Sequence, residues 1–171
     1  MKSKLVFLFL SFFLLLPAGC FDARPKRDLI LSRDFNPQAY PTLAVINLDP
    51  QIRFSQYVEA ELLKRGYKVK EGSAVGQLLK KEGLLKDGAL DAQGLARVGN
   101  LLQVQGIVLC SVLEFSRFRE AYRLSIRCVA PDTGDTLWYA EGAMEGKGGQ
   151  KSSELLKEIV AASLNRLPPM P

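Results

Sequence analysis

Three strand-like segments follow one another closely in the second half of the chain, and they restrict the fold more than any other feature. They span residues 106–115 (GIVLCSVLEF), 121–129 (AYRLSIRCV) and 136–144 (TLWYAEGAM). The middle segment alternates strictly and gathers Tyr122, Leu124, Ile126 and Cys128 on one face. Short links between strands require antiparallel pairing, and the PDTGD link with Gly134 is typical of a turn. An antiparallel sheet with one apolar face is therefore predicted.

Strands and helices alternate in the first half of the chain. Thr42–Leu48 and Tyr67–Lys70 have the pattern of strands, and helices are predicted over 51–65, from Ser73 and after Asp91. Long helical crossovers imply parallel pairing of the first three strands. A last helix begins at Ser152 or Ser153 and ends at Pro168.

This order, β-α-β-α-α-β-β-β-α, predicts an α/β (α+β) fold with a mixed sheet of about five to six strands and helices packed on it. We expect a single domain over residues 41–167 and a C-terminal tail over 168–171.

The N-terminus has the organisation of a bacterial lipoprotein signal. Lys2 and Lys4 precede an apolar run over 5–16, which is too short to span a bilayer. Ala18, Gly19 and Cys20 then resemble a lipobox, although Pro17 stands where leucine is usual. We expect residues 1–19 to be a signal peptide and Cys20 to carry a diacylglycerol on its sulfur and an N-acyl lipid. The alternative is a secretory peptide that is cut nearby without lipidation.

A lipid on Cys20 would place the protein in the cell envelope. Two acyl chains hold a protein stably on a membrane, whereas one binds only marginally. Phe21 follows the cysteine, and by resemblance to enterobacterial lipoproteins a residue other than aspartate favours the outer membrane. Residues 20–40 have no clean period and are predicted to be the lipidated N-terminus and a tether, with the domain facing the periplasm.

The composition excludes several kinds of chemistry. The 171 residues contain no histidine, which removes Ser-His-Asp and Cys-His arrangements and the histidine-bearing zinc motifs. The formal net charge of +5 is only mildly basic, so no nucleic acid partner is expected. The segment GAMEGKGGQKSS lacks the glycines of a phosphate-binding loop, so no nucleotide is expected. We expect no catalytic residue, no metal site and no cofactor beyond the covalent lipid.

Cys110 and Cys128 lie on the two longest strands. If the hairpin turns around Arg119, these two residues lie opposite each other and could form a disulfide. A one-residue slip in register would separate them. Buried free thiols and a redox-active pair are the alternatives.

Four arginines near the same hairpin form a candidate partner surface. Arg117 and Arg119 belong to the predicted hairpin tip, whereas Arg123 and Arg127 share the polar face of a strand. Such a set is either a solvated sheet face or a surface for an anionic partner. The carboxylates of Glu59 and Glu61 are interpreted as surface groups.

The segment from RGYKV to PDTGDTLW resembles a group of bacterial envelope lipoproteins, the CsgG/LpoB-like group. The turn at residues 132–138 (DTGDTLW) resembles the D-x-x-[TS]-G-x-x-L-W turn of that group, whereas Val104-Gln105-Gly106 departs from its usual "GAD". In length the chain is most similar to a family of uncharacterised lipoproteins in this group. The resemblance implies fold and compartment more than activity. A CsgG-type channel needs additional membrane-spanning strands, and every such stretch here already belongs to the core sheet.

The function that follows is a non-catalytic outer-membrane lipoprotein. It would bind a protein partner or form a homo-oligomer as an accessory protein in envelope assembly, secretion or transport. The alternatives are an envelope enzyme that acts on glycans with paired carboxylates, and a thiol-redox protein that uses Cys110 and Cys128.

Overall fold

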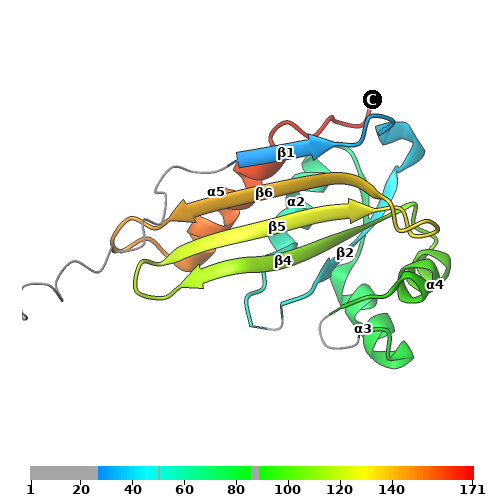
Figure 1. The fold of residues 1–171 in the computed structure, drawn as a ribbon, viewed down its shortest axis with the longest axis horizontal. Coiled ribbons are helices and arrows are strands. Elements are labelled where there is room, and N and C mark those ends of the chain that lie inside the picture. Colours follow the sequence, from blue (N-terminus) through cyan, green and yellow to red (C-terminus); the bar gives the residue numbers. More distant parts are fainter. Residues whose placement is uncertain (1–26, 50, 86–88) are drawn as a thin grey trace, which may run out of the picture.

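The computed structural model describes residues 27–49, 51–85 and 89–171. The signal peptide, the lipidation site Cys20 and residues 21–26 of the predicted tether lie outside these ranges. The described chain forms one six-stranded mixed sheet with helices packed on it, as predicted (Figure 1). None of the helices in the described ranges has the length and apolar character needed to cross a membrane.

The strands lie in the order β1-β6-β5-β4-β2-β3. β2 (Thr42–Asn47) pairs in parallel with both β3 (Lys68–Lys70) and β4 (Gly106–Ser116), whereas β4, β5 (Ala121–Val129) and β6 (Thr136–Glu145) form antiparallel hairpins. Both pairing predictions are therefore confirmed. The link lengths account for this result, because only a helical crossover can return the chain parallel to itself.

Four α-helices cover the sheet. α2 (Ser55–Lys64) and α5 (Ser152–Leu164) lie on one face, and α3 (Gly72–Glu82) and α4 (Ala92–Leu102) lie on the other. Asp91 caps α4 as predicted, since its carboxylate accepts a 2.7 Å hydrogen bond from the Gly94 amide. The predicted cap of α3 is wrong, because that helix already starts at Gly72 and the Ser73 hydroxyl donates to Glu71 instead.

The core has two parts, one on each face of the sheet. The larger part joins α2 and α5 to alternating residues of β4, β5 and β6, with Trp138 and Phe54 among its fully buried side chains. The smaller part joins α3 and α4 to the other face of β2 and β4. Apart from Val129 at the end of β5, the smaller core includes only these two strands. Within the described ranges no helix covers the same face of β1, of β6 or of the rest of β5, and β5 and β6 lie in front in Figure 1.

The structure shortens the segment that could serve as a tether. Residues 20–40 were predicted to be irregular, but β1 (Arg27–Leu31) pairs antiparallel with β6, and a short 3-10 helix, η1, spans Pro37–Ala39. Leu29 of β1 packs on the larger core. Five residues are too few to show a reliable period, and this edge strand is fixed by its partner β6 rather than by its own sequence.

The C-terminal tail turns back over the junction between α2 and β3. The Met170 amide donates a 2.8 Å hydrogen bond to the Arg65 carbonyl, and the Tyr67 hydroxyl donates to the Pro168 carbonyl over 2.9 Å. α5 ends at Leu164, a little before the proline that was predicted to end it. The tail is thus part of the folded domain.

Candidate functional site: the open face of the sheet

One face of β1, β5 and β6, with the adjoining end of β4, has no covering helix among the described residues. The registers place Arg127 beside Tyr139, and Tyr139 beside Ile30. We call this surface the open face and define it by Ile30, Glu114, Arg123, Arg127, Tyr139 and Glu141. Ile30 is an exposed apolar side chain on this face, with 62% exposure.

A polar network crosses the open face. Arg123 donates to Glu141 over 2.6 Å and to Glu114 over 3.0 Å, and the Tyr139 hydroxyl donates to Glu141 over 2.8 Å. The hydrogen bonds from Arg123 to Glu141 and Glu114 raise the pKa of its guanidinium. Burial, followed by the hydrogen bond to Glu141, raises the pKa of Tyr139. The hydrogen bonds of Arg123 to Glu114 and Glu141 join β4, β5 and β6 and so stiffen the open face. The opposite charges leave the surface around Arg123 nearly neutral.

The four predicted surface arginines therefore do not form one basic patch. Arg123 and Arg127 lie on the open face as predicted, but two carboxylates neutralise Arg123. Arg117 and Arg119 lie in the turn between β4 and β5 and have no ion pair with any described residue. The sequence correctly predicted which arginines lie on strands and which lie in the turn. The glutamate partners of Arg123 could not be predicted, because they depend on the strand register, which alternation does not determine.

Cys110 and Cys128 are buried and free. The register that was predicted to join them is wrong, because Cys110 lies opposite Ile126 and Cys128 lies opposite Val108. Both side chains belong to the core beneath α2 and α5, and burial raises the pKa of each thiol. The thiolate is the reactive form of cysteine, so a raised pKa makes both groups poor nucleophiles.

We expect neither thiol to react with an alkylating reagent in the native protein at neutral pH, and both to react in urea. Intact-mass measurement after iodoacetamide treatment reads this directly. The mass of the untreated protein should also be the same with and without reductant. Modification of either cysteine in the native state would instead support the thiol-redox alternative.

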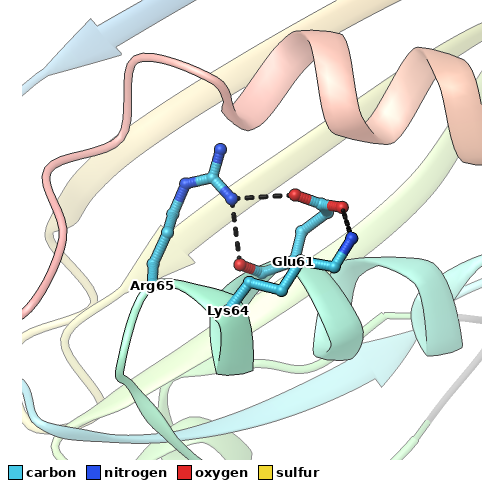
Figure 2. Close-up of polar contacts among 3 residues, drawn as sticks. All are labelled: Glu61, Lys64 and Arg65. Atoms are coloured by element: carbon cyan, nitrogen blue, oxygen red, sulfur yellow. Dashed lines mark hydrogen bonds and ion pairs between the residues drawn. The ribbon is translucent and has the colours of Figure 1, made fainter.

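A buried carboxylate on α2 belongs to the scaffold rather than to the open face. Glu61, which was interpreted as a surface group, is only 8% exposed. It accepts hydrogen bonds from Lys64 over 2.6 Å and from Arg65 over 2.8 Å, and Arg65 also donates to the Glu61 backbone carbonyl (Figure 2). Lys64 is the last residue of α2 and Arg65 is its C-cap, so the cluster joins the end of α2 to the segment that holds the C-terminal tail.

Glu61 makes stability depend on pH. Burial by itself would raise the pKa of this carboxyl, but the hydrogen bonds from Lys64 and Arg65 outweigh it, and the pKa lies below its ordinary value of 4.5. Because the folded pKa is depressed, the stabilisation is present above 4.5 and is lost as pH falls through the folded value. We expect Glu61→Gln to remove this part of the acid destabilisation, measured as the free energy of unfolding against pH. Glu158→Gln, on the exposed side of α5, should leave the profile unchanged.

A hollow of about 630 Å³ lies where the parallel strands end, between the first turns of α2 and α3. Glu59 and Glu71 both line it, with Arg53, Asp49 and Asn47. Burial raises the pKa of Glu59, and the nearby negative charge of Glu71 raises it further. The glycan-enzyme alternative would apply to this hollow, because two carboxylates line it and the pKa of Glu59 is raised.

Comparisons with models of protein families and with curated proteins found no match. Several solved structures share the fold. A PelC dodecamer from Paraburkholderia phytofirmans matches 86% of this chain and 99% of its own, with 10% sequence identity and a TM-score of 0.57. The lipoprotein GNA1162 from Neisseria meningitidis matches 74% of this chain and 96% of its own, with 18% identity and a TM-score of 0.56. The C-terminal domain of LpoB from Salmonella enterica matches 63% of this chain and 84% of its own, with 12% identity and a TM-score of 0.46.

At these identities the first two matches show a shared fold. The matches cover nearly the whole of the PelC and GNA1162 chains in those structures. A bacterial lipoprotein is among them, in agreement with the resemblance drawn from the sequence. Membership of the CsgG-like group, or of the family of uncharacterised lipoproteins, stays a prediction.

Proposed function

We propose that this chain is a non-catalytic lipoprotein of the outer membrane, held at the periplasmic side by a lipid on Cys20, that acts through association with further copies of itself. The observation that carries the proposal is the whole-domain likeness to a PelC dodecamer, joined with a lipobox-like N-terminus. In this role the protein is an accessory component in envelope assembly, secretion or transport.

The open face is the surface that fits self-association best. It combines an exposed apolar residue, Ile30, with charged groups whose positions are fixed by hydrogen bonds. Interfaces between proteins typically combine an apolar centre with a polar rim in this way. β1 is also an edge strand, so its outer side offers unpaired backbone groups beside Ile30.

The lipid anchor is tested by metabolic labelling with a fatty acid in cells that produce the wild type or Cys20→Ala. We expect label in the wild type and none in the variant, because the thiol that receives the diacylglycerol is gone. Equal labelling of the two proteins would contradict the anchor.

Self-association is tested by light scattering on the lipidated protein in detergent. We expect an oligomer in the wild type and a smaller species in Ile30→Glu, because the substitution buries an unpaired charge if the open face is covered. Leu101→Glu is the matched control, since Leu101 is 51% exposed on α4, away from the open face. A monomeric wild type would contradict self-association, and the partner would then have to be a different protein.

The enzyme alternative has one specific observation in its favour, the pair Glu59 and Glu71 in the hollow between α2 and α3. If the hollow acted on glycans, Glu59→Gln would abolish turnover of a peptidoglycan digest, because Glu59, whose pKa is raised by burial, would be the proton donor. We expect no turnover by the wild type. Release of glycan fragments by the wild type, with none released by Glu59→Gln, would establish the enzyme alternative.

A further inference from the structure

We propose that the turn between β4 and β5 is a second membrane contact, in which the Phe118 side chain enters the headgroup region and Arg117 and Arg119 lie against phosphate groups. This inference rests on the proposed lipid anchor and adds the orientation of the domain on the membrane. The chemistry it requires is an anionic lipid surface.

Phe118 is the clearest unexplained feature of the described surface. Its relative exposure is 104%, higher than that of any other large apolar side chain described. The neighbouring Phe115 stacks on Tyr122, with ring centroids 4.9 Å apart, so the packing of the hairpin does not require Phe118. A phenyl ring held out on a turn gains free energy only when another apolar phase receives it.

Two arginines flank this ring, and neither has an ion pair with a described residue. Aromatic side chains bordered by arginine or lysine are typical of segments that lie in the membrane interface, because the ring enters the acyl boundary while the cations remain among the headgroups. Anionic lipids attract such cations over about one Debye length. The order Arg117-Phe118-Arg119 at the apex of a turn provides both parts of this pattern.

The turn also lies at the end of the sheet where the anchored chain enters. Arg27, the first described residue, is paired with Gly142 of β6, and Gly142 is paired with Leu124 of β5. From Leu124, β5 continues back to Ala121 and then to the turn, about 10 Å further on. Figure 1 shows β1 beginning at the end where the β4–β5 hairpin turns.

The length of chain before Arg27 makes this placement consequential. Seven residue steps separate Cys20 from Arg27, and an extended chain of that length reaches at most ~25 Å. The lipid therefore holds this end of the domain close to the bilayer, and the projecting turn lies within the same distance. A protein partner of the turn would have to fit between the domain and the bilayer, whereas the membrane surface is already next to the turn.

The charge around the turn agrees with an anionic surface. The link between β6 and α5 lies at the same end and carries Lys147 and Lys151, both exposed (Figure 1). Over residues 117–120 and 145–154, the cations Arg117, Arg119, Lys147 and Lys151 exceed the acidic groups Glu120, Glu145 and Glu154 by one. Phe118 has a cation on each side.

The contact can be measured with the full lipidated protein. The protein is reconstituted into vesicles of phosphatidylethanolamine and phosphatidylglycerol, with or without bromine on the acyl chains. Bromine quenches tryptophan fluorescence only at contact distance. The wild type reports Trp138, which is 1% exposed and serves as an internal check of folding. Phe118→Trp places a second tryptophan at the turn, and Leu101→Trp places one on α4 at the opposite end of the sheet, as the matched control (Figure 1).

We expect brominated lipids to cause a loss of fluorescence and a blue shift in Phe118→Trp, and no loss in Leu101→Trp or in the wild type. Flotation of the vesicles, measured on the same samples, tests the anchor separately. Protein that floats with the vesicles while Phe118→Trp is not quenched would overturn the membrane contact and leave the anchor standing. Protein that does not float would overturn both. Equal quenching of the two tryptophan variants would also overturn the membrane contact. So would a blue shift of Phe118→Trp in detergent that accompanies oligomer formation, because it would assign the turn to contacts between copies of the protein.

Discussion

Gly142→Val is expected to lower the free energy of unfolding by about 3 kcal/mol or more, because the added side chain has no room beneath α5. A Cβ atom at this position would lie 2.2 Å from the Ser163 hydroxyl and 2.7 Å from the Ile159 side chain. Gly142 lies in the middle strand of three, paired with β1 on one side and β5 on the other. The helix can relieve the overlap only by moving off the strands it covers.

Urea unfolding followed by Trp138 fluorescence measures the effect, since this side chain is buried in the core that α5 closes. Gly148→Ala is the matched control, because a Cβ atom there would meet nothing within 4 Å. The control should stay within about 0.5 kcal/mol of the wild type. A small effect of Gly142→Val would mean that α5 does not pack on β6 as closely as described.

The fold could be predicted to the level of pairing because two physical constraints are visible in the sequence. Link length separates parallel from antiparallel strands, and alternation identifies the buried face of β5. Gly142 is also a signal of this kind, since glycine inside a strand marks a place where another segment comes close. That signal could have placed α5 over β6.

Register could not be predicted, and the cysteine pair failed for this reason. The observed pairing of Cys110 is two residues away from the predicted one. One residue of this offset arises at the turn, where Ser116 pairs with Ala121, and the irregularity between Val112 and Glu114 adds the second. The extra residue of such a bulge shifts the alternation along β4 by one, but Val112, Leu113 and Phe115 are all apolar, so the sequence pattern does not reveal the shift. Glu120 has a positive φ of 47° in the turn, and the sequence does not predict this conformation either.

The candidate site depended on the same missing information. The sequence places Arg123 on the polar face of its strand, but only the register brings Glu114 and Glu141 to it. Phe118 lies between Arg117 and Arg119 of the predicted partner surface, and its full exposure became visible only when the rest of the hairpin was packed. Composition identifies which side chains are available, whereas geometry decides which of them remain without partners.

Phe54→Ala should be the most damaging of the phenylalanine truncations, with a loss of about 3 to 5 kcal/mol in the free energy of unfolding. Phe54 precedes the first turn of α2, is 0% exposed and packs in the core with Val58 and Leu62. Its removal leaves a cavity that the surrounding strands can fill only in part.

Phe118→Ala deletes the same atoms from a fully exposed side chain instead of a buried one. We expect the free energy of unfolding of this variant in detergent to stay within about 0.5 kcal/mol of the wild type. The same urea titrations measure both variants. If Phe118→Ala were as destabilising as Phe54→Ala, the ring would be packed in the solution structure and would be unable to enter a membrane. A stable Phe118→Ala that dissociates from anionic vesicles faster than the wild type would instead show that this phenylalanine contributes to membrane attachment and not to folding.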